Sequence, residues 1–158
     1  MDTQHWRLRL LNFYPPFLGA GVRVRPLEDG FEARMKLRWW NRNYVGTHFG
    51  GSLFTMCDPF FMLILARALG SDYVVWDKTA TIRFRRPGRG TVRARFTIDS
   101  DRVAEIRAEA DRLGKTEPHF EADVTGPEGE IVAQIEKLLH VSRRDRQPTA
   151  TSGSTPPA

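Results

Sequence analysis

The stretch from Asn43 to Phe61 reads NYVGTHFGGSLFTMCDPFF, a polar, glycine-rich loop that runs directly into an apolar segment. The apolar segment continues to Gly70 and is apolar on nearly every side, which predicts a helix buried on most of its faces. Ser52 or the glycines before it can begin this helix, and Gly70 can end it. A helix without a polar face needs the rest of the chain to cover it.

Strand patterns occupy most of the remaining sequence. Residues 31–39 alternate apolar and charged side chains, and the predicted inward face holds Phe31, Ala33, Met35, Leu37 and Trp39. Further strand patterns lie at residues 73–86, 91–99, 119–125 and 130–142, and a charged surface helix is expected at 101–114. Turn signals at 87–90 and 126–129 indicate hairpins between successive strands. We therefore expect an α+β fold in which a curved antiparallel sheet is wrapped around one long central helix.

The chain divides into three expected parts. Residues 1–20 form an N-terminal helical segment, in which an amphipathic helix over residues 5–18 is stopped by Pro15 and Pro16. Residues 21–143 form the single domain. Residues 144–158 contain no apolar side chain able to dock, which predicts a disordered tail.

The composition is typical of a soluble globular domain, with 158 residues, 41% of them apolar and 27% charged. Asp58, Pro59 and Arg67 interrupt the longest apolar segment, so no membrane span is expected. The N-terminal segment places arginines within its apolar stretch and does not resemble a signal peptide. The single cysteine, Cys57, is expected to be a core residue, and the protein is expected to be cytoplasmic.

The net charge of +5 and the pI near 9.9 would suit a partner that is anionic. The arginines are spread along strands, however, without a basic arm or the spacing of a zinc or helix-turn-helix motif. A nucleic-acid partner is therefore not expected. A phosphorylated ligand and simple solvation of the strand faces both remain compatible with this charge.

Asp58 is a carboxylate among apolar neighbours, which include Met56, Cys57 and Phe60. Burial of an ionised carboxylate is unfavourable and raises its pKa, and acids perturbed in this way are concentrated at catalytic sites. Pro59 removes one helical hydrogen bond and is expected to kink the helix next to the acid. The alternative is a structural carboxylate that pairs with an arginine or caps a local group.

Gly50 and Gly51 stand where the loop enters the helix, so a ligand oxygen could approach unpaired backbone N–H groups there. Such groups can form an oxyanion hole, although a glycine pair is also compatible with a flexible loop. Eight residues separate Gly50 from Asp58, and eight helical residues rise about 12 Å. One reacting carbon cannot contact both groups of one chain. If the two act together, a second copy must supply one of them across a two-fold axis.

The frame N-x-x-G-x-x-F-G-G over residues 43–51, followed by S-L-F-T-M-C-D, resembles the active-site segment of hot-dog-fold acyl-CoA thioesterases of the phenylacetate-degradation type. It is closer to a group of uncharacterised hot-dog proteins described as tetrameric acyl-CoA thioesterases, which share the Asp58–Pro59 pair and a strand like YVVWDK at residues 73–78. The resemblance covers roughly residues 20–142. It implies a homodimer, often paired into a tetramer, that hydrolyses fatty or aromatic acyl-CoA without a metal.

The resemblance also assigns roles. Gly50 matches the glycine whose N–H polarises the thioester carbonyl, and Asp58 matches the carboxylate that acts as nucleophile or as general base on water. Asn43 matches the asparagine that orders the attacking water or the carbonyl. Thioesterases of this type usually have histidine before the glycine pair, whereas Phe49 stands at that position here and His48 falls one residue earlier.

Several further residues are candidates for auxiliary roles. His48 is either a loop residue bonded to the backbone or a base, as in hot-dog hydroxyacyl-thioester dehydratases. Gly51 can add a second backbone donor, and Thr55 can either bond near the site or pack in the core. Guanidinium groups suit the phosphates of coenzyme A, but they also discourage edge pairing of strands; the arginines concerned are Arg83, Arg85, Arg86 and Arg89.

The leading hypothesis from the sequence is therefore an acyl-CoA thioesterase with Asp58, Gly50 and Asn43 at its centre. Coenzyme A enters only as part of the substrate; no cofactor is expected, and the isolated histidines His5, His119 and His140 predict no metal site. Two other hypotheses stay open, and a nucleic-acid binder ranks behind them. One is a non-catalytic protein that binds acyl-CoA or regulates through it, and the other is a dehydratase that uses His48.

Overall fold

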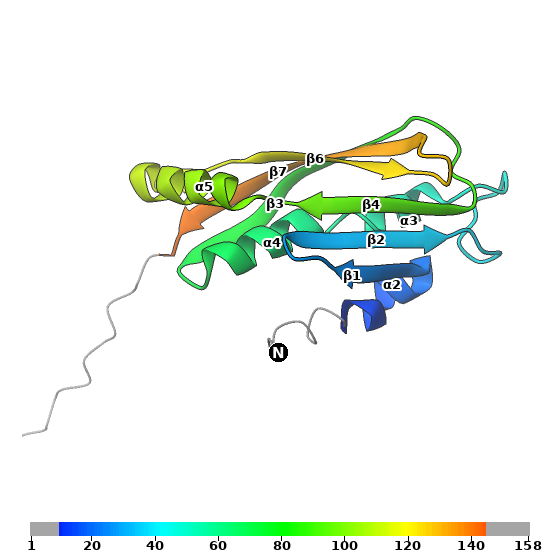
Figure 1. Cartoon of the computed structure of the whole chain (residues 1–158), viewed down its shortest axis with the longest axis horizontal. Helices are drawn as coiled ribbons and strands as arrows, with labels where there is room; N and C mark the ends of the chain where they lie inside the picture. Colours follow the sequence, from blue (N-terminus) through cyan, green and yellow to red (C-terminus); the bar gives the residue numbers. More distant parts are fainter. Residues whose placement is uncertain (1–9, 145–158) are drawn as a thin grey trace, which may run out of the picture.

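Figure 1 shows the computed structural model, which describes residues 10–144, as an antiparallel sheet with helices α3 (Gly50–Thr55) and α4 (Phe60–Leu69) running along it. Within these residues the sheet has seven strands: β1 (Val22–Pro26), β2 (Gly30–Lys36), β3 (Tyr73–Phe84), β4 (Thr91–Thr97), β5 (Lys115–Thr116), β6 (His119–Thr125) and β7 (Ile131–Arg143). The other helices are η1 (Leu10–Phe13), α2 (Pro15–Ala20) and α5 (Ser100–Leu113). The predicted α+β fold, a curved antiparallel sheet around a central helix, is confirmed.

The strand order is β1-β2-β4-β6-β7-β3, and β5 pairs with β7. The hairpin between β6 and β7 across residues 126–129 is present. The hairpin expected across residues 87–90 is wrong, because this segment joins β3 at one edge of the sheet to β4 in its interior. Strand β3 pairs along its length with β7, and β4 pairs with β2 over its seven residues. Strands β3 and β4 therefore pair with other strands of the sheet instead of with each other.

The inward faces of the strands follow the predicted alternation. Phe31, Ala33 and Met35 of β2 are buried. Leu37 is half-buried and Trp39 is 77% exposed, so the expected strand ends early. The chain turns there because the Arg38 N–H donates to Asn41 Oδ1 at 2.7 Å. The short strand β1, which the sequence analysis did not identify, pairs with β2.

The prolines near the N-terminus begin a helix instead of ending one. Helix α2 starts at Pro15 and ends at Ala20, and the next residue, Gly21, has a left-handed φ of 76°. The expectation of a helix stopped by Pro15 and Pro16 is therefore wrong, because the first helical N–H groups lack intrahelical partners and proline loses nothing there. Residues 5–9 of that expected helix, with the rest of residues 1–9, and residues 145–158 of the expected tail lie outside the described residues.

The central helix is broken at the predicted place. Residues 56–59 separate α3 from α4, and Pro59 has no N–H to continue the helical ladder. The Cys57 N–H donates to the Phe54 carbonyl at 2.9 Å, which is a tighter turn than an α-helix makes. The segment Gly50–Leu69 is long and apolar enough to cross a membrane, and half of it is buried inside this fold. Its α4 part packs aromatic residues into the core, where the Phe60 and Phe96 rings stack with centroids 4.7 Å apart.

Candidate active site

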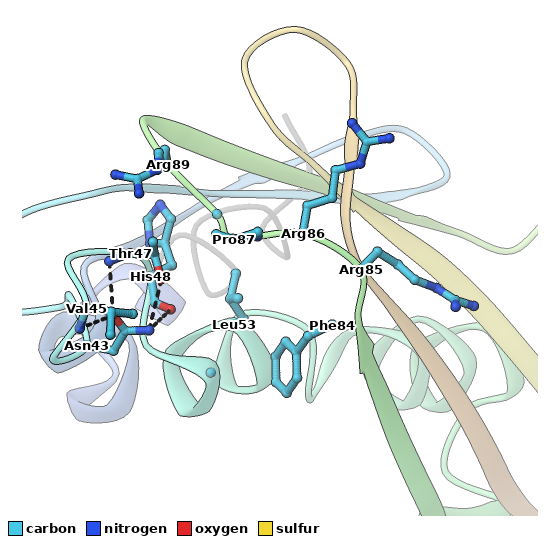
Figure 2. Close-up of a pocket in the computed structure, with 12 residues that line it drawn as sticks. Asn43, Val45, Thr47, His48, Leu53, Phe84, Arg85, Arg86, Pro87 and Arg89 are labelled. Carbon is cyan, nitrogen blue, oxygen red and sulfur yellow. Dashed lines mark hydrogen bonds between the residues drawn. The ribbon is translucent and has the colours of Figure 1, made fainter.

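A pocket of about 490 Å³ lies where the loop before α3 meets the turn after β3. Figure 2 shows the turn passing above Leu53 and Phe84, with Asn43, Val45 and Thr47 to one side. The lining residues are Asn43, Val45, Thr47, His48, Gly50, Leu53, Phe84, Arg85, Arg86, Pro87, Gly88 and Arg89. The pocket thus combines part of the predicted glycine motif with three of the four predicted arginines.

Gly50 is the first residue of α3 and lines this pocket. Its N–H makes no hydrogen bond within residues 10–144, whereas the N–H groups of Ser52 and Leu53 both donate to the Phe49 carbonyl. A Cβ atom at Gly50 would lie 3.0 Å from Phe84 Cζ, so the phenyl ring covers this glycine closely. Gly50 therefore supplies an available backbone donor at an apolar wall.

The side chain of Asn43 holds its own loop together. Its Oδ1 accepts from the N–H groups of Val45 and Thr47 at 3.1 and 3.0 Å. Its Nδ2 donates to Thr47 Oγ1 at 2.9 Å and, at 3.4 Å, to the His48 carbonyl. Figure 2 shows these bonds beside the pocket. Every donor and acceptor of the amide is engaged, so the side chain shapes the pocket by fixing the loop.

His48 is buried at the rim of the pocket, with 3% of its surface exposed. Its Nε2 lies 3.1 Å from the Gly90 carbonyl, which can only accept, so Nε2 carries the proton and Nδ1 has the lone pair. Nδ1 has no partner within residues 10–144. Burial lowers the pKa of His48 below 6.5, and the bond to Gly90 offsets this only in part. The ring is therefore neutral near pH 7 and tied to the backbone.

The predicted arginines divide into two groups. Arg83 pairs with Glu136 on the neighbouring strand and does not line the pocket. Arg85 lines it, but its Nε donates to Gln134 Oε1 at 2.7 Å. Arg86 and Arg89 make no ion pair within residues 10–144, and both line the pocket. These two side chains are the cations available to a ligand there.

Asp58 stands outside the pocket of its own chain, as its separation from Gly50 predicts. Its side chain is 52% exposed, so the expected burial among apolar neighbours is wrong. The break at Pro59 is the reason: it directs Met56 and Cys57 into the core and Asp58 outward. Asp58 Oδ1 accepts from Lys137 Nζ at 2.9 Å. The expected alternative, an ion pair, is present, but its partner is a lysine on β7 and not an arginine.

Lys137 is fully buried and joins two carboxylates. Its Nζ donates to Asp58 Oδ1, to the Asp58 carbonyl oxygen and, at 3.0 Å, to Asp77 Oδ2. Three donors thus meet three acceptors, which is the full capacity of an ammonium group. The register between β3 and β7 shifts between Asp77 and Thr79, and the alternation of half-buried side chains that includes Val75 and Asp77 continues at Ala80 and Ile82, three residues after Asp77 instead of two. This bulge directs Asp77 toward Lys137.

Lys137 is the main residue that the sequence analysis missed. It occupies an inward position of β7, in phase with Ile135, Leu139 and Val141, which are all fully buried. A charged residue on the apolar face of a predicted strand was the available signal, because a buried cation requires anionic partners.

The remaining candidates have local partners. Thr55 Oγ1 donates to the Gly51 carbonyl at 2.8 Å, and the Phe49 ring covers Gly51, where a Cβ atom would lie 2.4 Å from Phe49 Cε1. Cys57 is fully buried, and burial raises the pKa of its thiol to about 12. Its burial and raised pKa make Cys57 an unreactive core residue.

The comparisons with known proteins agree with this architecture. The model of a family described as a domain of unknown function, DUF4442, matches residues 4–141. The crystal structure of a protein of unknown function from Pseudomonas aeruginosa, described as a probable thioesterase, has a TM-score of 0.80 and 29% sequence identity. That match covers 91% of this chain and 99% of the other. No curated protein matches the sequence.

Two further solved structures share the fold. A thioesterase from Haemophilus influenzae has a TM-score of 0.68 and 18% identity, covering 93% of this chain and 97% of the other. A protein of unknown function from Chlorobaculum tepidum has a TM-score of 0.72 and 17% identity, covering 89% and 94%.

Proposed function

The chain belongs to the DUF4442 domain family and has the hot-dog fold, and on this premise we propose that it hydrolyses the thioester bond of an acyl-CoA. The similar Pseudomonas aeruginosa and Haemophilus influenzae structures, described as a probable thioesterase and a thioesterase, support a thioesterase-type function. The single observation that carries the proposal is the unbonded Gly50 N–H in a pocket beneath an arginine-rich turn.

The pocket supplies what a thioester carbonyl requires. Attack on that carbonyl places negative charge on its oxygen, and a backbone N–H that is already in position stabilises this charge without reorganisation. Leu53 and Phe84 form the apolar part of the wall, which suits an acyl group. A volume of about 490 Å³ lies within the range of small-molecule sites. Arg86 and Arg89 line the pocket and are the proposed partners for the phosphates of coenzyme A.

The carboxylate in this proposal comes from a second copy of the chain. The pocket contains no Asp or Glu among its lining residues, and Asp58 is exposed elsewhere. Asp58 Oδ1 is held by Lys137, whereas Oδ2 makes no bond within residues 10–144 and can accept a proton. We assign to Asp58 the role of general base on water. Asn43 fixes the loop that forms one wall.

Strand β3 indicates how two copies would meet. It is a sheet edge of 12 residues that pairs with β7 alone within residues 10–144, and such an edge favours pairing with another strand. Gly50 packs against Phe84 near one end of β3, and Lys137 links Asp58 to Asp77, nearer the other end. Antiparallel pairing of two β3 strands about an axis near Ala80 and Thr81 would bring each Asp58 toward the partner's Gly50.

The proposed reaction is balanced without a cofactor. Water adds to the thioester carbonyl as Asp58 takes its proton, and the carbonyl π electrons move to the oxygen that faces the Gly50 N–H. Collapse of this intermediate breaks the carbon–sulfur bond, and the thiolate of coenzyme A receives the proton from Asp58. A carboxylic acid and free coenzyme A result.

The test is thiol release from a panel of fatty and aromatic acyl-CoA esters by the purified protein. Because the Cys57 thiol has a pKa of about 12 and is fully buried, it adds little background to a thiol assay. We expect turnover that Asp58→Asn removes. Wild-type protein that releases no thiol from any ester overturns the proposal.

One observation favours a second candidate, a protein that binds acyl-CoA without turnover. The pocket of one chain contains no carboxylate, and Asp58 is engaged in an ion pair. Calorimetric binding of acyl-CoA together with the absence of thiol release would establish this candidate. The neutral, backbone-bonded His48 gives the dehydratase alternative less support.

A further inference from the structure

A second group of cations lies on the outer face of strands β1, β2 and β4, which are neighbours in the sheet (Figure 1). Val22, Met35 and Val92 form a cross-strand row that is fully buried against the helices. Side chains alternate between the two faces of a strand, so the next row points to solvent. That row consists of Arg23, Arg34 and Arg93, all of which are exposed.

The row Arg23–Arg34–Arg93 is a run of like charges without compensation. Arg34 is the direct cross-strand partner of both other arginines, and like charges placed directly opposite each other destabilise a sheet. None of the three forms an ion pair within residues 10–144. The sheet thus maintains an unfavourable arrangement in the absence of an anion.

The neighbouring outward row shows that the same sheet can neutralise its arginines. Glu32 lies between Arg25 and Arg95 and pairs with both, at 3.3 Å from Arg25 and 3.4 Å from Arg95. One carboxylate is therefore present two residues before Arg34 but not beside it. The two rows lie on the same three strands and both have exposed arginines on β1 and β4, but β2 contributes a glutamate to one row and an arginine to the other, which makes the second row a built-in comparison.

The uncompensated row lines a hollow of about 610 Å³. Lys36 and Arg38 add two cations at the end of β2. The apolar part of the wall is formed by Trp40, Leu18 and Gly21. The Arg38 guanidinium lies 5.1 Å from the centre of the Trp40 ring, and Trp40 remains partly open to solvent. The hollow shares no residue with the pocket that contains Gly50. An aromatic surface beside five cations suits a ligand that carries both a ring and phosphates.

We propose that this hollow binds a nucleoside diphosphate or triphosphate, with its phosphates on Arg23, Arg34 and Arg93 and its base against Trp40. Guanidinium forks match phosphate oxygens bidentately, and an indole ring stacks on a nucleobase. The size is that of a small-molecule site. Glu32 interrupts the cationic stretch on one side of the row, whereas a nucleic-acid backbone needs a continuous basic track. The site is independent of the proposed hydrolysis.

Calorimetric titration of the full chain with ADP tests the proposal. We expect wild-type protein to bind ADP and Arg34→Gln to weaken binding about tenfold or more, since it removes the central fork. Arg95→Gln is the matched control, because it deletes the same charge from the same face where Glu32 already neutralises it. Trp40→Leu should weaken ADP binding while leaving binding of inorganic pyrophosphate nearly unchanged.

Two controls show whether a loss of ADP binding comes from unfolding or from the site of proposed hydrolysis. Arg34→Gln relieves like-charge repulsion, so its melting temperature should equal or exceed that of the wild type. Asp58→Asn should bind ADP as wild type does, whatever its effect on thiol release. The proposal is overturned if wild-type protein does not bind ADP, or if Arg34→Gln and Arg95→Gln weaken binding equally. It is also overturned if duplex DNA or phosphatidylserine vesicles occupy the face more tightly than ADP.

Discussion

Lys137 Nζ lies 2.9 Å from Asp58 Oδ1, although 79 positions separate the two residues in the chain. Lys137 is fully buried, whereas half of the Asp58 side chain is exposed. The ammonium group therefore anchors one carboxylate oxygen from below and leaves the other at the surface. Asp77 shares the same ammonium group from strand β3.

Neutralising each of the two carboxylates that share Lys137 should affect kcat differently. Asp58→Asn should lower kcat for thioester hydrolysis by about two to four orders of magnitude, as loss of a general base does. Asp77→Asn is the matched control, because it weakens the same ammonium contact but reaches no substrate. Each variant should lose about 1 kcal/mol of unfolding free energy, measured by urea denaturation. Equal losses of kcat in both variants would make Asp58 a purely structural partner.

Replacement of Gly50 by proline should remove one catalytic donor while preserving the helix. Proline has no N–H and is favoured at the first helical position, and Phe49 already has the φ of −65° and ψ of 130° that precede proline. Because Phe84 is exposed, its ring can move aside. We expect kcat to fall about 100-fold to 1,000-fold. Circular dichroism should match the wild type, and an active Gly50→Pro protein would exclude this N–H as the oxyanion donor.

Mixing two inactive variants should restore activity if the site is shared between copies. A dimer of one Asp58→Asn chain and one Gly50→Pro chain has one site with both native groups and one site with neither. After unfolding and joint refolding, half of the dimers are mixed, so about a quarter of wild-type activity should return. Either variant refolded alone is the control. A mixture as inactive as its components would exclude a site in which Asp58 and Gly50 of different chains act together.

Pairing of two β3 strands predicts where a cross-link can form. Thr81→Cys should give a disulfide-linked dimer on non-reducing gels, because the axis proposed near this residue brings its two copies within disulfide range. Val74→Cys is the control on the same strand, far from the axis. The native thiol does not interfere, since Cys57 is fully buried. Equal cross-linking of both variants, or none in Thr81→Cys, contradicts this arrangement.

The buried His48 should make stability depend on pH. Burial lowers its pKa below 6.5 in the folded protein, so between that lowered value and 6.5 the unfolded chain binds more protons. The His48 contribution is therefore complete above pH 6.5 and is lost as the pH falls below it. The slope should reach at most about 1.4 kcal/mol per pH unit. Urea denaturation across this range should give a flatter profile for His48→Gln, and parallel profiles would show that His48 titrates normally.

Local patterns predicted much of the fold. The inward faces of β2 and β4 follow from a period of two, because adjacent side chains on a strand point to opposite sides. The break beside Asp58 follows from the missing N–H of Pro59. The pairing of β3 did not follow, since the turn at residues 87–90 resembles a hairpin turn, and the longer partner, β7, begins more than forty residues later. Strand β1 was missed because its alternation spans only five residues.

Part of the candidate site also follows from local sequence patterns, and part depends on the tertiary structure. Gly50 belongs to the same short motif as Asn43, and the arginines at 85–89 lie close to one another in the chain, so local sequence patterns could identify each part of the lining. Only the fold brings Gly50 and these arginines into one pocket. The exposure of Asp58 and its bond to Lys137 depend on where the break directs the chain relative to β7. The arginine row on the outer face requires the register of three strands, which single-strand patterns do not contain.

The sequence by itself determined the apolar central helix, its interruption at Asp58 and Pro59, the glycine entry, and the two faces of most strands. These properties arise from backbone preferences and side-chain periodicity, which act over a few residues. Only the tertiary structure decided that Lys137 holds Asp58, that the Asp58 side chain is exposed, and that three arginines align across three strands. Ion pairs and strand registers depend on distances between remote segments, and those distances exist only once the sheet has formed.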